Sequence, residues 1–148
     1  MYNKILVAID DSDTSRCALA EALHLARTSD AKLYITHVAD ETLLSMHGRT
    51  FSTSLNIDNA IQAISEAGQK LLDEAIKDAE GIDAETLLLE ARQRRVSETL
   101  ADKARELGVD LIVIGRHGQR GLAKLILGSV AEQLAKIADA SVLLVRKH

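Results

Sequence analysis

Residues 108–118 read GVDLIVIGRHG, and after nine further residues the chain continues with Gly128 and Ser129. The run 110–115 is apolar and rich in branched side chains, which predicts a strand buried on both faces of a sheet. The glycines that follow mark a loop, and residues 128–138 have the spacing of a helix. A strand, a glycine-bearing loop and a helix in this order indicate one unit of an open parallel sheet.

Apolar runs and helix-patterned segments alternate along the rest of the chain. Strands are expected at residues 4–10, 31–38, 85–91, 110–115 and 141–146. Helices are expected at residues 16–28, 57–79, 96–107 and 128–138, with Asp11 capping the first of them and Ser97 the third. Residues 39–56 are expected to form a loop or a short irregular helix. The alternation favours a parallel sheet with helices on both faces, in a single α/β domain spanning residues 1–148.

The composition argues against two large classes of partner. Aromatic residues make up only 2% of the 148 residues, and nucleic-acid platforms need aromatic faces on which bases stack. The net charge of −4 provides no general attraction to nucleic acids or anionic membranes. We therefore expect neither partner, and any anion must be held by local geometry.

Cellular location and covalent chemistry are suggested by a few residues. Cys17 is the only cysteine, which excludes an intrachain disulfide and fits a reducing compartment. No signal peptide or membrane span is visible, so a cytoplasmic protein is expected. We identify no catalytic nucleophile–base pair and no metal site made of protein ligands. Four of the histidines lack metal-ligand spacing and are expected to have structural or surface roles: His24, His37, His47 and His148.

The glycine-bearing loop is the part of the sequence that suggests binding. In open parallel sheets, ligands bind beyond the carboxyl ends of the strands, where the strand order reverses. Glycines allow close approach of the backbone, and the first amides of the helix after Gly128 suit an anion. Ser129 adds a hydroxyl contact or caps the helix. A phosphate site and a plain turn before a helix both fit this pattern, which is neither a P-loop nor a dinucleotide fingerprint.

The spacing Gly115-x-x-Gly118-(nine residues)-Gly128-Ser129 resembles the nucleotide motif of ATP-binding universal stress proteins. Four segments carry the resemblance across nearly the whole chain: KILVAIDDS (4–12), GVDLIVIG (108–115), GSVAE (128–132) and VLLVR (142–146). The resemblance implies a Rossmann-like fold of the adenine nucleotide alpha-hydrolase type. It further implies the strand order 3-2-1-4-5, with the site between strands one and four.

The resemblance also implies a role for each residue of the site. Asp10 would hydrogen-bond the ribose, Ala8 would line the adjacent wall, and the backbone of Val38 would meet the adenine edge. The remaining site residues would surround the phosphates: Gly115, Arg116, His117, Gly118, Gly128, Ser129 and Val130. The ligand would be ATP, ADP or AMP, with Mg²⁺ held by phosphate oxygens and water.

Three functions are consistent with these features. The favoured one is an ATP-dependent stress-response or regulatory module with slow hydrolysis at most, since no water-positioning residue is identifiable. The alternatives are a slow ATPase or autophosphorylating enzyme, and a nucleotide-free interaction module. A fourth possibility, a phosphorelay receiver suggested by Asp10 and Asp11, requires an aspartate at the end of the third strand, where this chain has Glu90.

The last expected strand suggests how two copies of the chain assemble. Residues Ser141 to Arg146 would form an apolar edge of the sheet, and such an edge invites pairing with another copy of the chain. The family resemblance points in the same direction. We therefore expect a homodimer through this strand.

Overall fold

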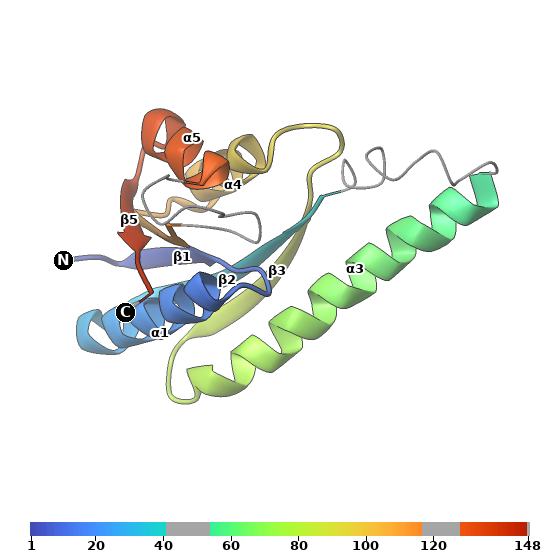
Figure 1. Ribbon diagram of the computed structural model, residues 1–148. Helices are drawn as coiled ribbons and strands as arrows, with labels where there is room; N and C mark the ends of the chain where they lie inside the picture. The colour runs from blue at the N-terminus through green and yellow to red at the C-terminus, as the bar shows by residue number, and fades with distance from the viewer. Residues whose placement is uncertain (41–53, 117–127, 148) are drawn as a thin grey trace.

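The computed structural model describes residues 1–40, 54–116 and 128–147 (Figure 1). Strands and helices alternate in the order β1 (Lys4–Ala8), α1 (Asp13–Ser29), β2 (Lys32–Ala39), α3 (Ser54–Ile76), η2 (Lys77–Ala79), β3 (Ala84–Glu90), α4 (Val96–Leu107), β4 (Leu111–Gly115), α5 (Ser129–Ile137) and β5 (Ser141–Val145). Every strand and helix expected from the sequence is present, with boundaries shifted by a few residues.

The five strands form one parallel sheet in the order β3-β2-β1-β4-β5. The predicted α/β fold class and the strand order are therefore confirmed. β1 lies at the centre, where Ala8 is opposite Thr36 of β2 on one side and Ile114 of β4 on the other. From β1 the sheet extends through β2 to β3 on one side, and through β4 to β5 on the other.

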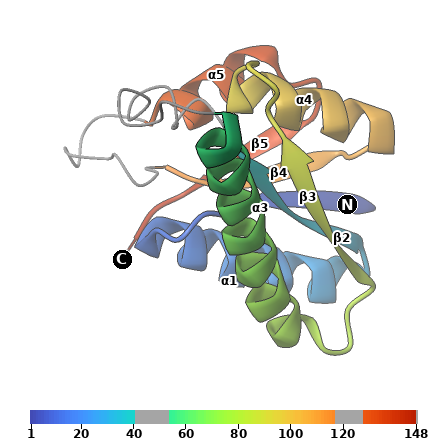
Figure 2. The ribbon, with the colours of Figure 1, turned by 90° about the vertical axis from the view of Figure 1, so that its right-hand side faces the viewer.

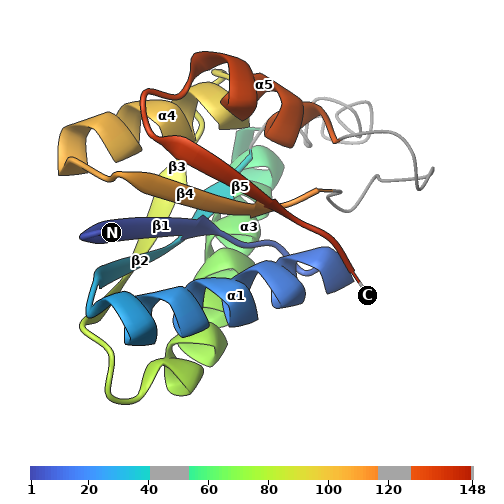
Figure 3. The ribbon, with the colours of Figure 1, turned by 90° about the vertical axis from the view of Figure 1, so that its left-hand side faces the viewer.

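The helices cover the sheet in two layers. α1 and α3 lie on one face, and α4 and α5 lie on the opposite face (Figures 2 and 3). Successive side chains of a strand point to opposite faces, so each central strand supplies both layers. Ile5 and Val7 belong to the core under α1 and α3, whereas Leu6 belongs to the core under α4 and α5. Burial on both faces explains why the buried positions of β1 are apolar on both sides of the strand.

Two helix caps differ from the expectation. α1 is capped by Ser12 rather than Asp11, because Ser12 has extended backbone angles and its Oγ accepts the Ser15 N–H at 3.2 Å. α4 is capped by Arg95 without a side-chain hydrogen bond. Ser97 lies inside the first turn of α4 and is only 2% exposed, so it cannot act as the cap.

The segment 39–56 also differs in part from the expectation. β2 continues to Ala39, and α3 begins at Ser54, so both elements extend into the segment expected to be a loop. Residues 41–53 lie outside the described residues. α3 runs well past the end of the sheet (Figure 1). Within the described ranges, no helix is both long and apolar enough to cross a membrane.

Candidate functional site

The carboxyl ends of β1 and β4 are the point where the chain connections diverge. α1 follows β1 on one face of the sheet, and α5 follows the loop after β4 on the other (Figure 3). Ala8 ends β1, and Gly115 ends β4 on the neighbouring strand. This is the position at which open parallel sheets bind ligands, and it is the position predicted from the sequence.

Gly115 is glycine because the first turn of α1 lies against it. A Cβ at this position would lie 3.0 Å from Thr14 Oγ1 and 3.1 Å from both the carbonyl carbon and Cβ of Thr14. Part of this obstacle is backbone, which cannot move aside as a side chain can. Gly115 therefore brings the end of β4 close to the start of α1.

A hydrogen bond joins the two ends of the loop after β4. The Gly128 N–H donates to the Arg116 carbonyl oxygen at 2.9 Å, and the Arg116 N–H donates to the Val145 carbonyl oxygen at 2.8 Å. Arg116 is half-buried and follows β4 directly. The structure thus brings Arg116 and Gly128 together, while His117 and Gly118 lie outside the described residues.

Among the described residues, no side chain caps the amino end of α5. Gly128 is the N-cap residue and provides no side-chain cap, so Ser129 is the first helical residue and Val130 the second. Ser129 is therefore not the cap, which was one of its two expected roles. The first amides of a helix have no intrahelical partner and carry the positive end of the helix dipole. α1, in contrast, is capped by Ser12.

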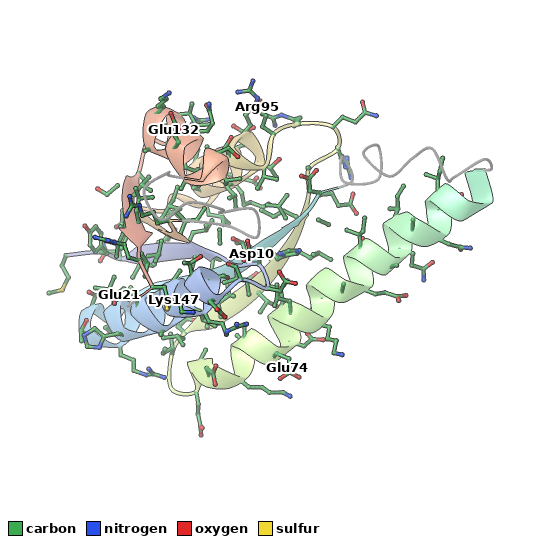
Figure 4. All side chains as sticks on the ribbon, in the orientation of Figure 1. Asp10, Glu21, Glu74, Arg95, Glu132 and Lys147 are labelled. Carbon is green, nitrogen blue, oxygen red and sulfur yellow. The ribbon has the colours of Figure 1, made fainter. Side chains whose placement is uncertain are left out.

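Asp10, labelled in Figure 4, lies in the turn between β1 and α1, and two hydrogen bonds hold it there. Its N–H donates to Ser15 Oγ at 2.8 Å, and its Oδ1 accepts the Ser12 N–H at 2.8 Å. Ser15 is buried. Asp10 itself is half-buried, and its hydrogen bond to Ser12 uses Oδ1 rather than Oδ2. One carboxylate oxygen of Asp10 thus holds the turn.

Val38 lies on the next strand, beyond the level of Ala8. It is the last residue but one of β2 and is 8% exposed. Its neighbour His37 places Nδ1 2.7 Å from the carbonyl oxygen of Ile9, which immediately precedes Asp10. Ala8 and Val38, on two adjacent strands, and Asp10, in the turn after β1, therefore all lie at the carboxyl edge of the sheet.

Charged groups beside this edge are mostly paired with one another. Lys147 Nζ lies 2.9 Å from Asp13 Oδ2, and Arg16 contacts the other oxygen of the same carboxylate. These hydrogen bonds, first that of Lys147, lower the pKa of Asp13 below its ordinary value. Arg94, from the turn after β3, is held by Asp102 at 2.6 Å. Over the described ranges, no group of three acidic, histidine or cysteine side chains is suited to hold a metal ion.

Three residues near the site were not identified from the sequence. Thr14 contacts Gly115, Ser15 holds the amide of Asp10, and His37 contacts the carbonyl of Ile9. The cluster of hydroxyl residues in 12–15 is a signal for Ser15, because such residues satisfy turn and helix-end amides. Gly68 in the middle of α3 is a signal for His37, since a glycine there weakens a helix and implies close packing.

The strand order and the helices on both faces define a doubly wound α/β domain. The model of the universal stress protein family matches residues 1–146, and the chain belongs to that family. Universal stress protein YxiE of Bacillus subtilis is 36% identical over 151 residues, covering 99% of this chain and 100% of that protein.

Solved structures of similar proteins have the same fold over nearly the whole chain. The structure of protein MJ0577 matches with a TM-score of 0.84 at 25% identity, covering 100% of this chain and 98% of the other. A universal stress protein from Archaeoglobus fulgidus, solved in complex with dAMP, matches with a TM-score of 0.64 at 27% identity, covering 97% and 98%. A universal stress protein in complex with cAMP matches with a TM-score of 0.64 at 26% identity, covering 97% and 96%.

Proposed function

We propose that this protein binds an adenine nucleotide, ATP in the first instance, at the carboxyl ends of β1 and β4. The observation that carries the proposal is the uncapped amino end of α5, joined to the end of β4 by the hydrogen bond between Gly128 and Arg116. Helix amino ends of this kind bind phosphate through backbone amides. Arg116 adds a positive charge in a protein that is acidic overall.

Each residue of the site has a distinct proposed role. The amides of Gly128, Ser129 and Val130 hold the phosphates, together with the loop that begins at Gly115 and includes Arg116, His117 and Gly118. Asp10 accepts a hydrogen bond from a ribose hydroxyl through its Oδ2. Ala8 lines the wall of the site, and the backbone of Val38 meets the adenine edge. Mg²⁺ arrives on the phosphates, because the described residues offer no cage of protein ligands for it.

The similar proteins support a nucleotide of this class. Two of the solved structures named above contain adenine nucleotides, dAMP in one and cAMP in the other. We propose that bound nucleotide controls contact with a downstream partner as part of a stress response. We propose slow turnover at most, since no side chain among the described residues is placed to activate water. A cytoplasmic location is proposed from the single cysteine, Cys17.

The test is to identify and measure the ligand directly. Mass spectrometry of small molecules released from freshly purified protein is expected to find an adenine nucleotide, and calorimetry with Mg²⁺ is expected to give a micromolar dissociation constant for ATP. Gly118→Ala combined with Gly128→Ala is expected to abolish binding. Lys136→Ala, at the far end of α5, is the matched control and is expected to bind normally. Absence of any nucleotide and of any heat would leave a protein-interaction module.

The proposal also covers how copies of the protein associate. β5 is an outer strand of the sheet, paired only with β4 within the described chain. We propose that residues Ser141–Arg146 pair with the same strand of a second copy, giving a homodimer.

A further inference from the structure

The peptide between Ile9 and Asp10 is held from both sides. Its N–H donates to Ser15 Oγ at 2.8 Å, and its carbonyl oxygen lies 2.7 Å from His37 Nδ1. A carbonyl oxygen can only accept, so Nδ1 of His37 carries the proton of this hydrogen bond. Fixing both polar groups of one peptide sets the direction in which the next side chain, that of Asp10, leaves the backbone.

His37 is itself confined by α3. A Cβ added to Gly68 would lie 2.7 Å from His37 Cδ2, 3.3 Å from His37 Nε2 and 2.9 Å from Leu88 Cδ1. Gly68 is buried in the middle of a 23-residue helix, where glycine costs about 1 kcal/mol relative to alanine. The absence of a side chain at Gly68 makes room for the imidazole between α3 and the sheet.

We propose that His37 is a positioning residue of the nucleotide site. Confined by Gly68, it donates from Nδ1 to the Ile9 carbonyl, and it thereby holds Asp10 with Oδ2 directed toward the ribose. This inference rests on the proposed nucleotide function for its ligand, but the hydrogen bond and its effect on the turn are independent of any ligand.

Two substitutions of His37 separate the hydrogen bond from the ring. In His37→Asn the side-chain nitrogen is the same number of bonds from Cα as Nδ1, so it can donate to Ile9. In His37→Gln the nitrogen takes the place of Nε2 and faces α3 instead. Both variants lose the ring, so each is the control for the other. We expect ATP affinity to fall about tenfold in His37→Gln and to stay within about threefold of wild type in His37→Asn.

A second readout needs no nucleotide. Amide hydrogen exchange at Asp10 and Ser12 in the ligand-free protein is expected to accelerate about tenfold in His37→Gln and to be unchanged in His37→Asn. Imidazole nitrogen shifts of the wild-type protein are expected to show the proton on Nδ1. If wild type binds no nucleotide, the proposed function fails, and the exchange rates still decide whether His37 holds the turn.

Gly68→Ala tests the confinement without changing His37 and remains informative should both histidine variants fail to fold. The added methyl is expected to displace the imidazole and weaken ATP binding about tenfold. The positioning role is overturned by equal affinities of His37→Asn and His37→Gln, by a proton on Nε2 alone, or by a Gly68→Ala variant that is more stable than wild type with unchanged affinity.

Discussion

Two residues in the turn between β3 and α4 have a backbone conformation that is unfavourable for any residue with a Cβ atom. Arg92 and Gln93 have φ of 49° and 68°, the left-handed region in which Cβ crowds the following carbonyl. Each such residue costs about 1–2 kcal/mol. The turn links the carboxyl edge of the sheet to α4, and the Arg94 N–H donates to the Ala91 carbonyl oxygen at 2.9 Å to close it.

Gln93→Gly is expected to stabilise the protein. Glycine adopts φ of 68° without the penalty of a side chain, and its greater freedom in the unfolded chain offsets only part of this gain. The expected increase in the free energy of unfolding is about 0.5–1 kcal/mol, measured by urea denaturation. Glu80→Gly, at an exposed turn residue with φ of −57°, is the control and is expected to destabilise. Destabilisation by Gln93→Gly would contradict the prediction.

At the scale of single residues, the glycines of the loop could be recognised from the sequence, but the side chains that hold the neighbouring turn could not. Glycines indicate a loop by residue type alone, so Gly115 and Gly128 could be identified as its ends. His37 was expected only to have a structural or surface role, because its contact with Ile9 depends on the register of β1 against β2. Asp11 and Ser12 are both good capping residues, and only their backbone angles decide between them.

At the scale of elements, the first turn of α1 is held by contacts on three sides. Ser12 caps it, Gly115 lies against Thr14, and Lys147 from the segment after β5 bonds to Asp13. The end of the described chain accordingly lies beside the start of α1 (Figure 3). A carboxylate in the first turn also interacts favourably with the helix dipole. Asp13 thus links α1 to the chain segment that follows β5.

Asp13→Asn is expected to lower the melting temperature at neutral pH, with a difference that disappears in acid. The pKa of Asp13 is lowered in the folded protein, so its charge stabilises the fold above the ordinary carboxylate pKa of about 4. That contribution is lost as the pH falls through the lowered value, where wild type and variant should converge. The effect is small because the pair is exposed, and added salt should reduce it.

Glu80→Gln is the control for this comparison, because Glu80 is exposed and makes no ion pair within the described ranges. It is expected to leave the melting temperature unchanged at every pH. A constant difference between Asp13→Asn and wild type from neutral to acidic pH would show that the carboxylate charge is not what stabilises α1.

The elements themselves were largely predictable. Strands buried on both faces need continuous runs of apolar residues, so β1 and β4 are recognisable without any knowledge of their neighbours. β3 was harder to recognise because its burial is incomplete, as expected for an outer strand. The start of α3 at Ser54 was missed because it follows a polar stretch with no apolar stripe.

At the scale of the whole molecule, β5 has one edge without a strand partner among the described residues. Ser141 and Val145 direct their backbone groups toward the β4 side, since the Ser141 N–H donates to Asp110, just before β4, and the Val145 carbonyl accepts from Arg116, just after it. Alternate residues of a parallel strand bond to the same neighbour, so Val142 and Leu144 direct their N–H and C=O groups away from the sheet. These are the groups that a second copy would meet.

Leu144→Pro is expected to produce a monomer. Proline removes an outward N–H and leaves the bonds from β5 to β4 in place. Leu144→Ala is the matched control, because it loses the same side chain and keeps the N–H. At micromolar concentration, light scattering is expected to give twice the 16.1 kDa chain mass for wild type and Leu144→Ala, and the single mass for Leu144→Pro. A monomeric wild type would refute the proposed interface.

The strand order also determines what the growing polypeptide exposes during translation. Residues 1–90 contain β1, β2 and β3 together with α1 and α3, so a half-sheet can assemble before the second half is synthesised. Both helices cover the same face. Leu6, Tyr34 and Leu89 on the other face therefore remain exposed to solvent until α4 and α5 emerge from the ribosome. A nascent chain halted after β3 would be a natural client for chaperones that recognise apolar sheet surfaces.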